Sequence, residues 1–213
     1  MPDGTKLEIK RGRKFDQVLT GARDVFLRDG FEGASVDDIA RAAGVSKATL
    51  YSYFPDKRLL FMEMAKVECA RQADHVMDTV DLELPIDQVL RHVCAEIVAL
   101  IMSDFGRSIF RICVGESTRF PELGREFYAS GPEMGRTRLS ELLQCGIDTG
   151  QLAIDDLPLA ADQLAELCKA DLFDRMMFNI TDTFTEAETS RVINGAVDMF
   201  MARYGAGAVV STT

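Results

Sequence analysis

One segment constrains the fold of this chain more than any other: SVDDIARAAGVSKATLYSYFPDK, residues 35–57. Ser35, with Asp38 three positions later, is typical of a capped helix start, and apolar residues then recur at helical spacing up to Gly44. Ser46 can cap a second short helix, which a proline ends because its ring lacks the backbone donor. Since glycine can adopt the left-handed conformation, the segment predicts two short helices that cross steeply at a turn.

The outer face of the second helix carries a distinctive set of side chains. The positions that face inward and fix the crossing angle are Ile39, Ala43, Val45 and Leu50. The positions that face outward are Lys47, Ala48, Thr49, Tyr51, Ser52 and Tyr53. Lysine can donate to guanine acceptors, alanine can pack on a thymine methyl, and hydroxyl groups can donate to phosphates or base edges. This pattern predicts a helix-turn-helix that enters the major groove of DNA; a hairpin used only for packing is the alternative.

Charge is distributed unevenly along the chain. The formal net charge of −10 over 213 residues should repel a polyanion, yet residues 1–66 carry a net charge of +2 and residues 67–213 a net charge of −12. The most basic stretch directly precedes the first predicted helix and contains Lys6, Lys10, Arg11, Arg13 and Lys14. We expect this arm either to contact phosphates and the minor groove or to be a disordered, solubilising tail.

Apolar spacing predicts helix in nearly every other part of the chain, and no alternating strand pattern is present. Gly30 supplies the C-terminal stop of the first helix. The expected fold is therefore all-α, with about nine helices, over residues 15–29, 36–44, 46–54, 56–80, 86–102, 105–117, 131–150, 157–179 and 186–204. The expected domains are a flexible arm (1–14), a DNA-binding domain (15–60), a second helical domain (61–204) and a flexible tail (205–213).

Composition argues against several other classes of protein. No apolar run approaches the ~18 uncharged residues that a membrane span requires, and the N-terminus has no apolar signal core, so we expect a cytoplasmic protein that does not bind membranes. The five dispersed cysteines indicate buried thiols, and two histidines 17 positions apart make a metal site improbable. Nucleophile and glycine-rich phosphate motifs are also missing. We therefore expect no enzymatic activity, no metal and no cofactor.

The stretch FEGASVDDIARAAGVSKATLYSYFPDKRLLF resembles the N-terminal domain of the TetR family of transcriptional regulators, over residues 15 to about 63. The resemblance implies that one set of residues holds phosphates, namely Ser35, Thr49, Tyr51 and Lys57. It implies that a second set reads or approaches bases, namely Lys47, Ala48, Ser52 and Tyr53. We add Ser46, the predicted cap of the helix that carries these residues, to the DNA-binding set. Asp37 and Asp38 depart from the family pattern; they either favour the helix N-terminus or lessen non-specific DNA affinity.

The C-terminal part is similar to the AefR-like branch of the same family, on the strength of RICVGESTRFPELGREFY and a later GIDTGQL. The resemblance implies a cavity for a small-molecule effector, enclosed by the helices near 56–80, 86–103, 105–118 and 122–149. Methionine and phenylalanine adapt to varied apolar ligands, so we expect an apolar or amphipathic effector. The candidate lining residues are Met64, Val67, His92, Ile109, Phe110, Cys113, Phe127 and Met134.

The resemblance further implies a homodimer held by the last two helices. The candidate interface residues are Leu164, Leu167, Cys168, Leu172, Met176, Val192, Ile193, Ala196, Val197 and Phe200; the alternative is that they form the core of one chain. The predicted function is a homodimeric repressor that an effector releases from a palindromic double-stranded DNA operator. A helical protein-interaction module, whose helix-turn-helix does not bind DNA, is the alternative.

Overall fold

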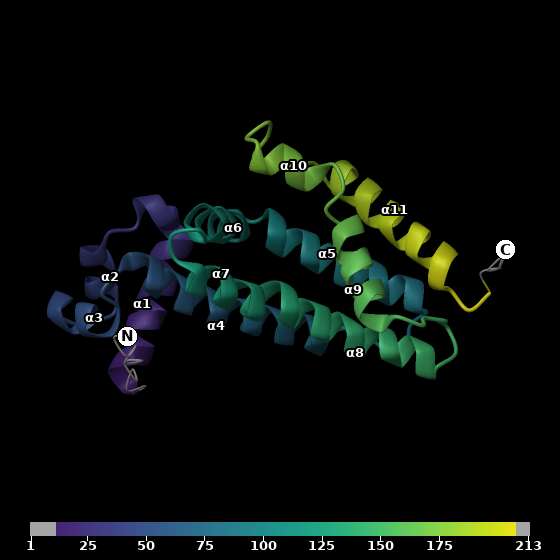
Figure 1. Cartoon of the computed structure of the whole chain (residues 1–213), viewed down its shortest axis with the longest axis horizontal. Helices are drawn as coiled ribbons and strands as arrows, with labels where there is room; N and C mark the ends of the chain where they lie inside the picture. Colours follow the sequence, from purple (N-terminus) through teal and green to yellow (C-terminus); the bar gives the residue numbers. More distant parts are fainter. Residues whose placement is uncertain (1–11, 208–213) are drawn as a thin grey trace. The chain divides into compact units, whose positions relative to one another are not determined.

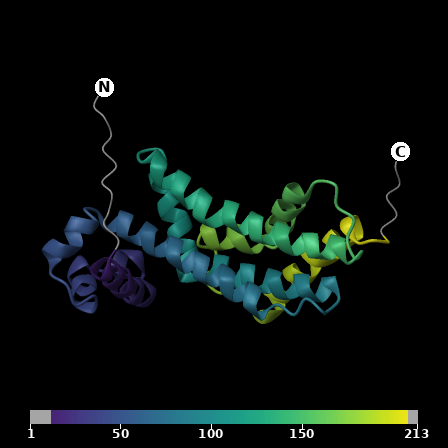
Figure 2. The same cartoon turned by 90° about the horizontal axis from the view of Figure 1, so that it is seen from below.

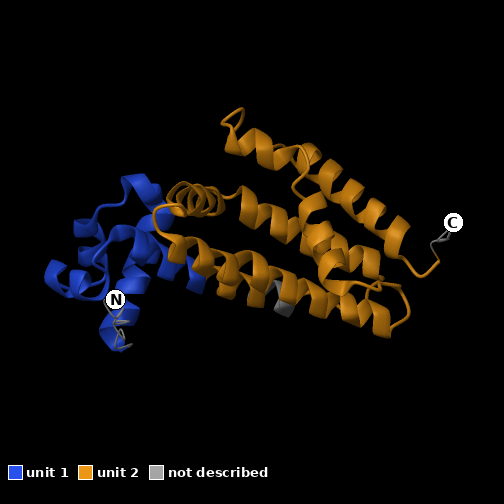
Figure 3. Ribbon diagram, viewed as in Figure 1, with its two compact units in different colours: residues 1–67 blue, residues 68–213 orange. Residues whose placement is uncertain are grey.

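The computed structural model describes residues 12–207, apart from the side chains of residues 75–78. Most of the predicted basic arm (1–14) and of the predicted tail (205–213) therefore lies outside the described residues. The chain divides into two compact units, residues 1–67 and 68–213, and the division falls within one long helix (Figure 3). Between residues 12 and 207 the secondary structure is helical, apart from an isolated β-bridge between Leu152 and Gly205, so the all-α prediction is confirmed.

Helices account for both units (Figure 1). The first unit contains α1 (Arg13–Gly33), α2 (Val36–Ala42), α3 (Lys47–Tyr53) and the start of α4 (Lys57–Thr79). The second unit contains the rest of α4, then α5 (Ile86–Met102), α6 (Asp104–Glu116), α7 (Pro121–Tyr128), the π-helical turn η1 (Ala129–Glu133), α8 (Met134–Asp148), α9 (Leu157–Leu167), α10 (Leu172–Met177) and α11 (Glu186–Tyr204).

Backbone conformation explains where the helices differ from the predicted ones. The segment 157–179, predicted as one helix, is divided into α9 and α10 because Asp171 adopts a left-handed conformation with φ 67°, which an α-helix cannot continue. Arg191 holds the Asp171 carboxylate in this position, with Nη2 2.6 Å from Oδ2. Gly30, at φ 70°, interrupts the helical backbone of α1 near its end, where the sequence predicted a stop.

The first unit depends on a close approach of α1 and α2. Gly21 of α1 lies so near α2 that a Cβ atom added to it would stand 2.5 Å from the backbone nitrogen of Ala43. Phe15, near the start of α1, packs on Phe54 at a ring separation of 5.4 Å and on the edge of Tyr53 at 5.9 Å. Because Gly21 has no side chain, α1 can lie close enough to α2 to support the turn between α2 and α3 from one side.

The core of the second unit lies among α5, α8, α9 and α11. In both views α11 packs along α5 (Figures 1 and 2), while α9 contacts α8 and α11. Leu90 and Cys94 of α5 are completely buried, as are Leu143 of α8, Leu164 of α9 and Val197 of α11. This apolar core is contributed by four helices of a single chain.

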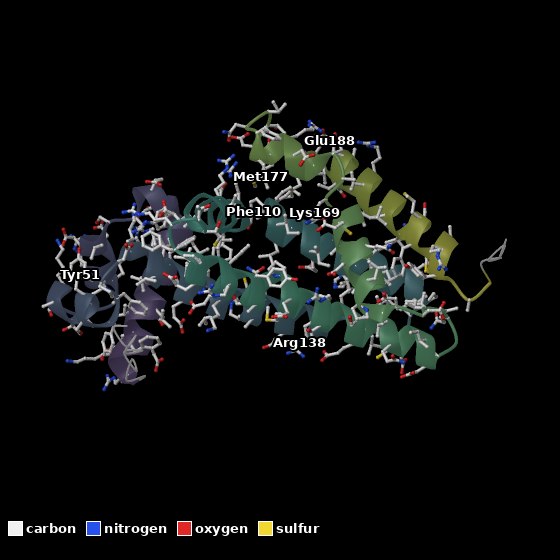
Figure 4. All side chains as sticks on the ribbon, viewed as in Figure 1. Tyr51, Phe110, Arg138, Lys169, Met177 and Glu188 are labelled. Carbon is white, nitrogen blue, oxygen red and sulfur yellow. The ribbon has the colours of Figure 1, made fainter. Side chains whose placement is uncertain are left out.

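The N-terminus of α11 is fixed by a capping box. The Glu188 N–H donates to Thr185 Oγ1 (3.3 Å), and the Thr185 N–H donates to Glu188 Oε2 (2.9 Å). Arg175 Nη1 donates to the same carboxylate at 3.1 Å. The Thr185 N–H, followed by the Thr185 hydroxyl and Arg175, lowers the pKa of Glu188 from 4.5 to about 2. Glu188 is labelled in Figure 4.

This capping box predicts acid sensitivity. Because the folded-state pKa of Glu188 lies below its unfolded-state value, the stabilisation is present above about pH 4.5 and is lost as the pH falls towards 2. We expect Glu188→Gln to be less stable than the wild type at pH 7, and the difference to shrink as the pH falls from 5 to 2. Urea unfolding midpoints across that range measure the effect, and a difference that does not change with pH would contradict it.

Candidate nucleic-acid interface

The turn between α2 and α3 has the geometry that the sequence predicts. Ser35 caps α2, since its Oγ accepts from the Asp38 N–H at 3.0 Å. Ser46 caps α3 in the same way, accepting from the Thr49 N–H at 3.1 Å. Between them Gly44 adopts φ 63°, and the chain turns through a hydrogen bond from the Val45 N–H to the Ala40 carbonyl (3.1 Å). Both caps and the left-handed glycine are confirmed.

Most positions in and around α3 are buried or exposed as expected, but Thr49 and Tyr53, predicted to face outward, are half-buried. Leu50 is 1% exposed and packs inward together with Ile39 and Ala43 of the α2 segment. Ser46, Lys47, Ala48, Tyr51 and Ser52 are exposed, as is Ser35, whereas Thr49 and Tyr53 are half-buried. Tyr51 is labelled in Figure 4. The structure thus places the predicted base-reading and phosphate-binding residues of α3 on one short helix.

Lys47 is ion-paired across the turn. Its Nζ lies 2.8 Å from Oδ1 of Asp37 on α2, with the two side chains 50% and 64% exposed. The Asp37 carboxylate raises the pKa of Lys47, and Tyr51, one helical turn further along α3, contributes in the same direction. No local sequence signal indicates this pair, because the residues are ten positions apart and belong to different helices. Only the turn at Gly44 brings them together.

Lys57 makes contacts inside the first unit. Its ammonium group donates to the carbonyls of Phe31 (2.8 Å) and Ala34 (3.0 Å) and stands 4.4 Å from the centroid of the Phe31 ring. Two of its three N–H donors therefore tie the start of α4 to the connection between α1 and α2. The phosphate contact predicted for Lys57 stays a prediction, for which one donor is left.

The predicted dimer residues of the last helices lie in the core of the single chain. Eight of the ten are buried at 8% exposure or less: Leu164, Cys168, Leu172, Met176, Val192, Ala196, Val197 and Phe200. Leu167 and Ile193 are partly buried against the same core. One chain therefore covers most of these side chains, which agrees with the alternative of a core within one chain. The contact of these residues with a second copy stays a prediction.

The predicted effector-cavity residues have varied surroundings. Met64, Ile109 and Cys113 are buried, whereas Val67 is 50% exposed and His92 is exposed near the Thr79 hydroxyl. The partly buried members are Phe110, Phe127 and Met134. The rings of Phe110 and Phe127 meet edge to face at 6.4 Å, and Phe110 meets Phe173 of α10 at 4.9 Å. The cavity itself stays a prediction.

Two surface hollows of about 550 and 510 Å³ are lined by other residues. The first lies in the first unit and is lined by Arg13, Asp16, Gln17, Thr20, Gly21, Ala42 and Ala43. The second lies in the second unit and is lined by Arg136, Thr137, Ser140, Glu141, Gln144, Leu157 and Pro158.

In the described part of the chain, no three His, Cys, Asp or Glu side chains gather in a way that could hold a metal ion. None of the helices described there has the length and apolar character to cross a membrane.

These features define a class: a helical protein with an N-terminal helix-turn-helix of the DNA-binding type, whose second helix exposes lysine, tyrosine and serine side chains. Residues 18–64 match the bacterial regulatory proteins of the tetR family, and residues 88–206 match the C-terminal domain of AefR-like transcriptional repressors. The chain belongs to the TetR family of transcriptional regulators.

Individual relatives agree with this assignment. The repressor AcnR of Corynebacterium efficiens is 37% identical over 62 residues, which cover 29% of this chain and 33% of AcnR. A TetR-family regulator of Mesorhizobium loti is 26% identical with a TM-score of 0.78, covering 91% of this chain and 97% of that one. The flavonoid-responsive regulator FrrA is 33% identical with a TM-score of 0.66, covering 92% and 98%. The chain thus aligns with about a third of AcnR and with nearly all of the two solved structures.

Proposed function

We propose that this chain is a cytoplasmic, homodimeric repressor that binds a palindromic operator through α3 and is released by a small-molecule effector. The observation that carries the proposal is the exposed face of α3, which presents Lys47, Ala48, Tyr51 and Ser52, while Leu50 anchors the opposite face in the core. The major groove admits an α-helix and presents acceptors for lysine and a thymine methyl for alanine. Hydroxyl groups on the same helix can bind the flanking phosphates.

A dimer accounts for a palindromic site. Two copies of α3 must lie about 34–36 Å apart to enter successive major grooves on one face of B-form DNA. Large apolar side chains that one chain leaves uncovered support such an assembly: Phe178, Ile180 and Met199 are 76%, 71% and 62% exposed. Phe178 and Ile180 lie two positions apart just after α10, and exposed apolar groups that gather in this way mark protein interaction surfaces. We therefore place the dimer contact on exposed side chains of the α10–α11 region.

The effector is proposed to be apolar or amphipathic and to bind in the second unit. The cluster of Phe110, Phe127 and Phe173 supports an aromatic or other apolar ligand, since these rings present edges and faces to one another (Figure 4 labels Phe110). FrrA, a relative of this chain, is a flavonoid-responsive regulator. An effector that prefers the DNA-free conformation must weaken DNA binding by the same factor by which DNA weakens effector binding.

Selection from a random pool of duplexes tests DNA binding, because the operator sequence is not needed in advance. We expect the wild-type chain to enrich a palindromic sequence and to bind it more tightly than a scrambled duplex of equal length. Sedimentation of the same complex gives the number of chains, and a panel of aromatic compounds added to it tests release. Failure to enrich any duplex would contradict the proposal and favour a protein-interaction module.

Two variants separate base contacts from phosphate contacts. Lys47→Met should cost about 1–3 kcal/mol on the selected duplex and much less on the scrambled one, because it removes a donor to a base edge. Tyr51→Phe should weaken binding to both duplexes in similar proportion, since every sequence presents the same phosphates. Affinities of each variant on the two duplexes, across a salt series, give both results. Equal losses for Lys47→Met on the two duplexes would make Lys47 a backbone contact.

A further inference from the structure

The ion pair between Asp37 and Lys47 lies on the surface proposed to meet DNA. Lys47 is the first residue of α3, and Ala48 and Tyr51 stand next to it and one turn away on the exposed side of that helix. The Lys47 ammonium and the Asp37 carboxylate are 2.8 Å apart and remain open to solvent. A carboxylate on a surface that approaches a polyanion is electrostatically unfavourable, so its presence there requires a reason.

The cap of α2 does not supply that reason, because Ser35 and Asp38 form it without Asp37. The Asp38 N–H donates to Ser35 Oγ at 3.0 Å, and the Asp38 carboxylate accepts from the Ser35 hydroxyl and from Arg41 Nη1, both at 2.6 Å. Asp37 lies one position earlier and directs its carboxylate across the turn to Lys47. The two neighbouring aspartates, equivalent in the sequence, therefore have different partners.

Folding stability does not supply the reason either. An exposed ion pair contributes little to stability, because solvent screens the charges and both side chains lose freedom. Its effect on the lysine is more specific. A lysine ammonium is a point charge on a flexible four-carbon chain, and near DNA it binds phosphates as readily as base edges. A carboxylate beside it fixes the direction of one donor and repels an approaching phosphate.

We propose that Asp37 is a positioning residue for sequence recognition: it holds the Lys47 ammonium where a base edge can accept from it and disfavours a phosphate contact at that position. The inference rests on the proposed function, that α3 binds duplex DNA. Neutralising Asp37 should then free Lys47 to bind any phosphate in reach. Affinity for all sequences rises, and discrimination between sequences falls.

The test compares Asp37→Asn, Asp37→Glu, Lys47→Met and the double variant Asp37→Asn/Lys47→Met with the wild type. The probes are the duplex enriched by the wild-type chain and a scrambled duplex of the same composition. Asp37→Asn should raise affinity for the scrambled duplex about 3-fold to 10-fold and for the enriched duplex less than about 2-fold. Asp37→Glu, which keeps the charge, should retain discrimination. In the Lys47→Met background, Asp37→Asn should leave discrimination unchanged.

A repeated selection with Asp37→Asn gives an independent readout. We expect this variant to lose preference at the same base pair of each half-site that Lys47→Met loses. Glu32→Gln is the matched control, because it removes an exposed acid of the same unit that lies on α1 and not, like Asp37 of α2, beside Lys47, and it should change no preference.

The possible failures are distinguishable. If Asp37→Asn raises both affinities equally and enriches the wild-type sequence, Asp37 is only a nearby charge, and this inference is overturned while the proposed function stands. If the wild-type chain enriches no duplex at all, the proposed function is overturned and this inference falls with it.

Discussion

Replacing Leu172 by glutamate is expected to unfold the second unit. Leu172 is 0% exposed at the start of α10 and belongs to the core shared by α5, α8, α9 and α11. The substitution removes the apolar contacts of a leucine and places an ionisable group where it has no solvent. Loss of a buried leucine alone costs about 2–5 kcal/mol, and an unpaired polar group adds to that cost, so most of the stability of a typical domain would be lost.

Leu159→Glu is the matched control for this prediction. Leu159 lies on α9, a helix of the same core, but is 49% exposed, so a glutamate there stays solvated. Denaturant unfolding followed by circular dichroism should show a large loss for Leu172→Glu and little change for Leu159→Glu. If the Leu172→Glu protein stays folded and becomes monomeric, the result would support the dimer interface predicted from the sequence.

Gly21→Ala is expected to disrupt the first unit, although it adds a single methyl group. The new Cβ would stand 2.5 Å from the Ala43 nitrogen and 2.7 Å from its Cα, both backbone atoms that cannot rotate away. Helices α1 and α2 must then separate, at a cost of about 1–3 kcal/mol, which is the usual range for overpacking in a core. Since α1 supports the turn before α3, DNA affinity should fall with stability.

Gly33→Ala controls for the general effect of replacing a helical glycine. An added Cβ at Gly33 meets nothing closer than the Asp29 side chain at 3.5 Å, and the residue is exposed. We expect stability within about 1 kcal/mol of the wild type, with a slight gain because alanine restricts the unfolded chain. Thermal unfolding midpoints of Gly21→Ala and Gly33→Ala measure the difference. If the two midpoints are equal, the contact between α1 and α2 adapts to the added methyl group without cost.

Local sequence signals predicted the first unit well because they act over a few residues. Ser35 and Ser46 each bond a backbone N–H three positions ahead, and Gly30 and Gly44 take the left-handed conformations expected at helix ends. These interactions depend on residue type and spacing alone. The break at Asp171 was missed for the same reason, since an aspartate within a periodic stretch carries no comparable stop signal.

Helical periodicity does not distinguish a core within one chain from an interface between two chains. The apolar stripes of α9 and α11 show that Leu164 and Val197 are buried, yet a stripe is equally suited to a neighbouring helix of the same chain and to a second copy. In the structure of one chain, both residues are 0% exposed. Which helix covers a stripe depends on tertiary contacts among segments more than 30 residues apart.

The residues that make up the candidate DNA interface could be predicted from the sequence, but the partners of their side chains could not. Every α3 residue named from the sequence is found on α3 or at its cap, with Leu50 as the buried anchor. The partners of the two lysines were not predictable: Lys47 meets Asp37 across the turn, and Lys57 meets two carbonyls about 25 positions earlier. A flexible side chain chooses its partner only after the backbone has brought several within reach.

The core of the second unit, closed within one chain, has a consequence for regulation by protein concentration. When a subunit leaves its hydrophobic core incomplete, dissociation and unfolding are one event, and dilution lowers the melting temperature. Here Leu164, Leu172 and Val197 are already covered without a second copy. In the proposed dimer, association and folding would then be separate equilibria. The number of chains per cell would set the occupancy of a two-fold site by mass action, and each released subunit would stay folded.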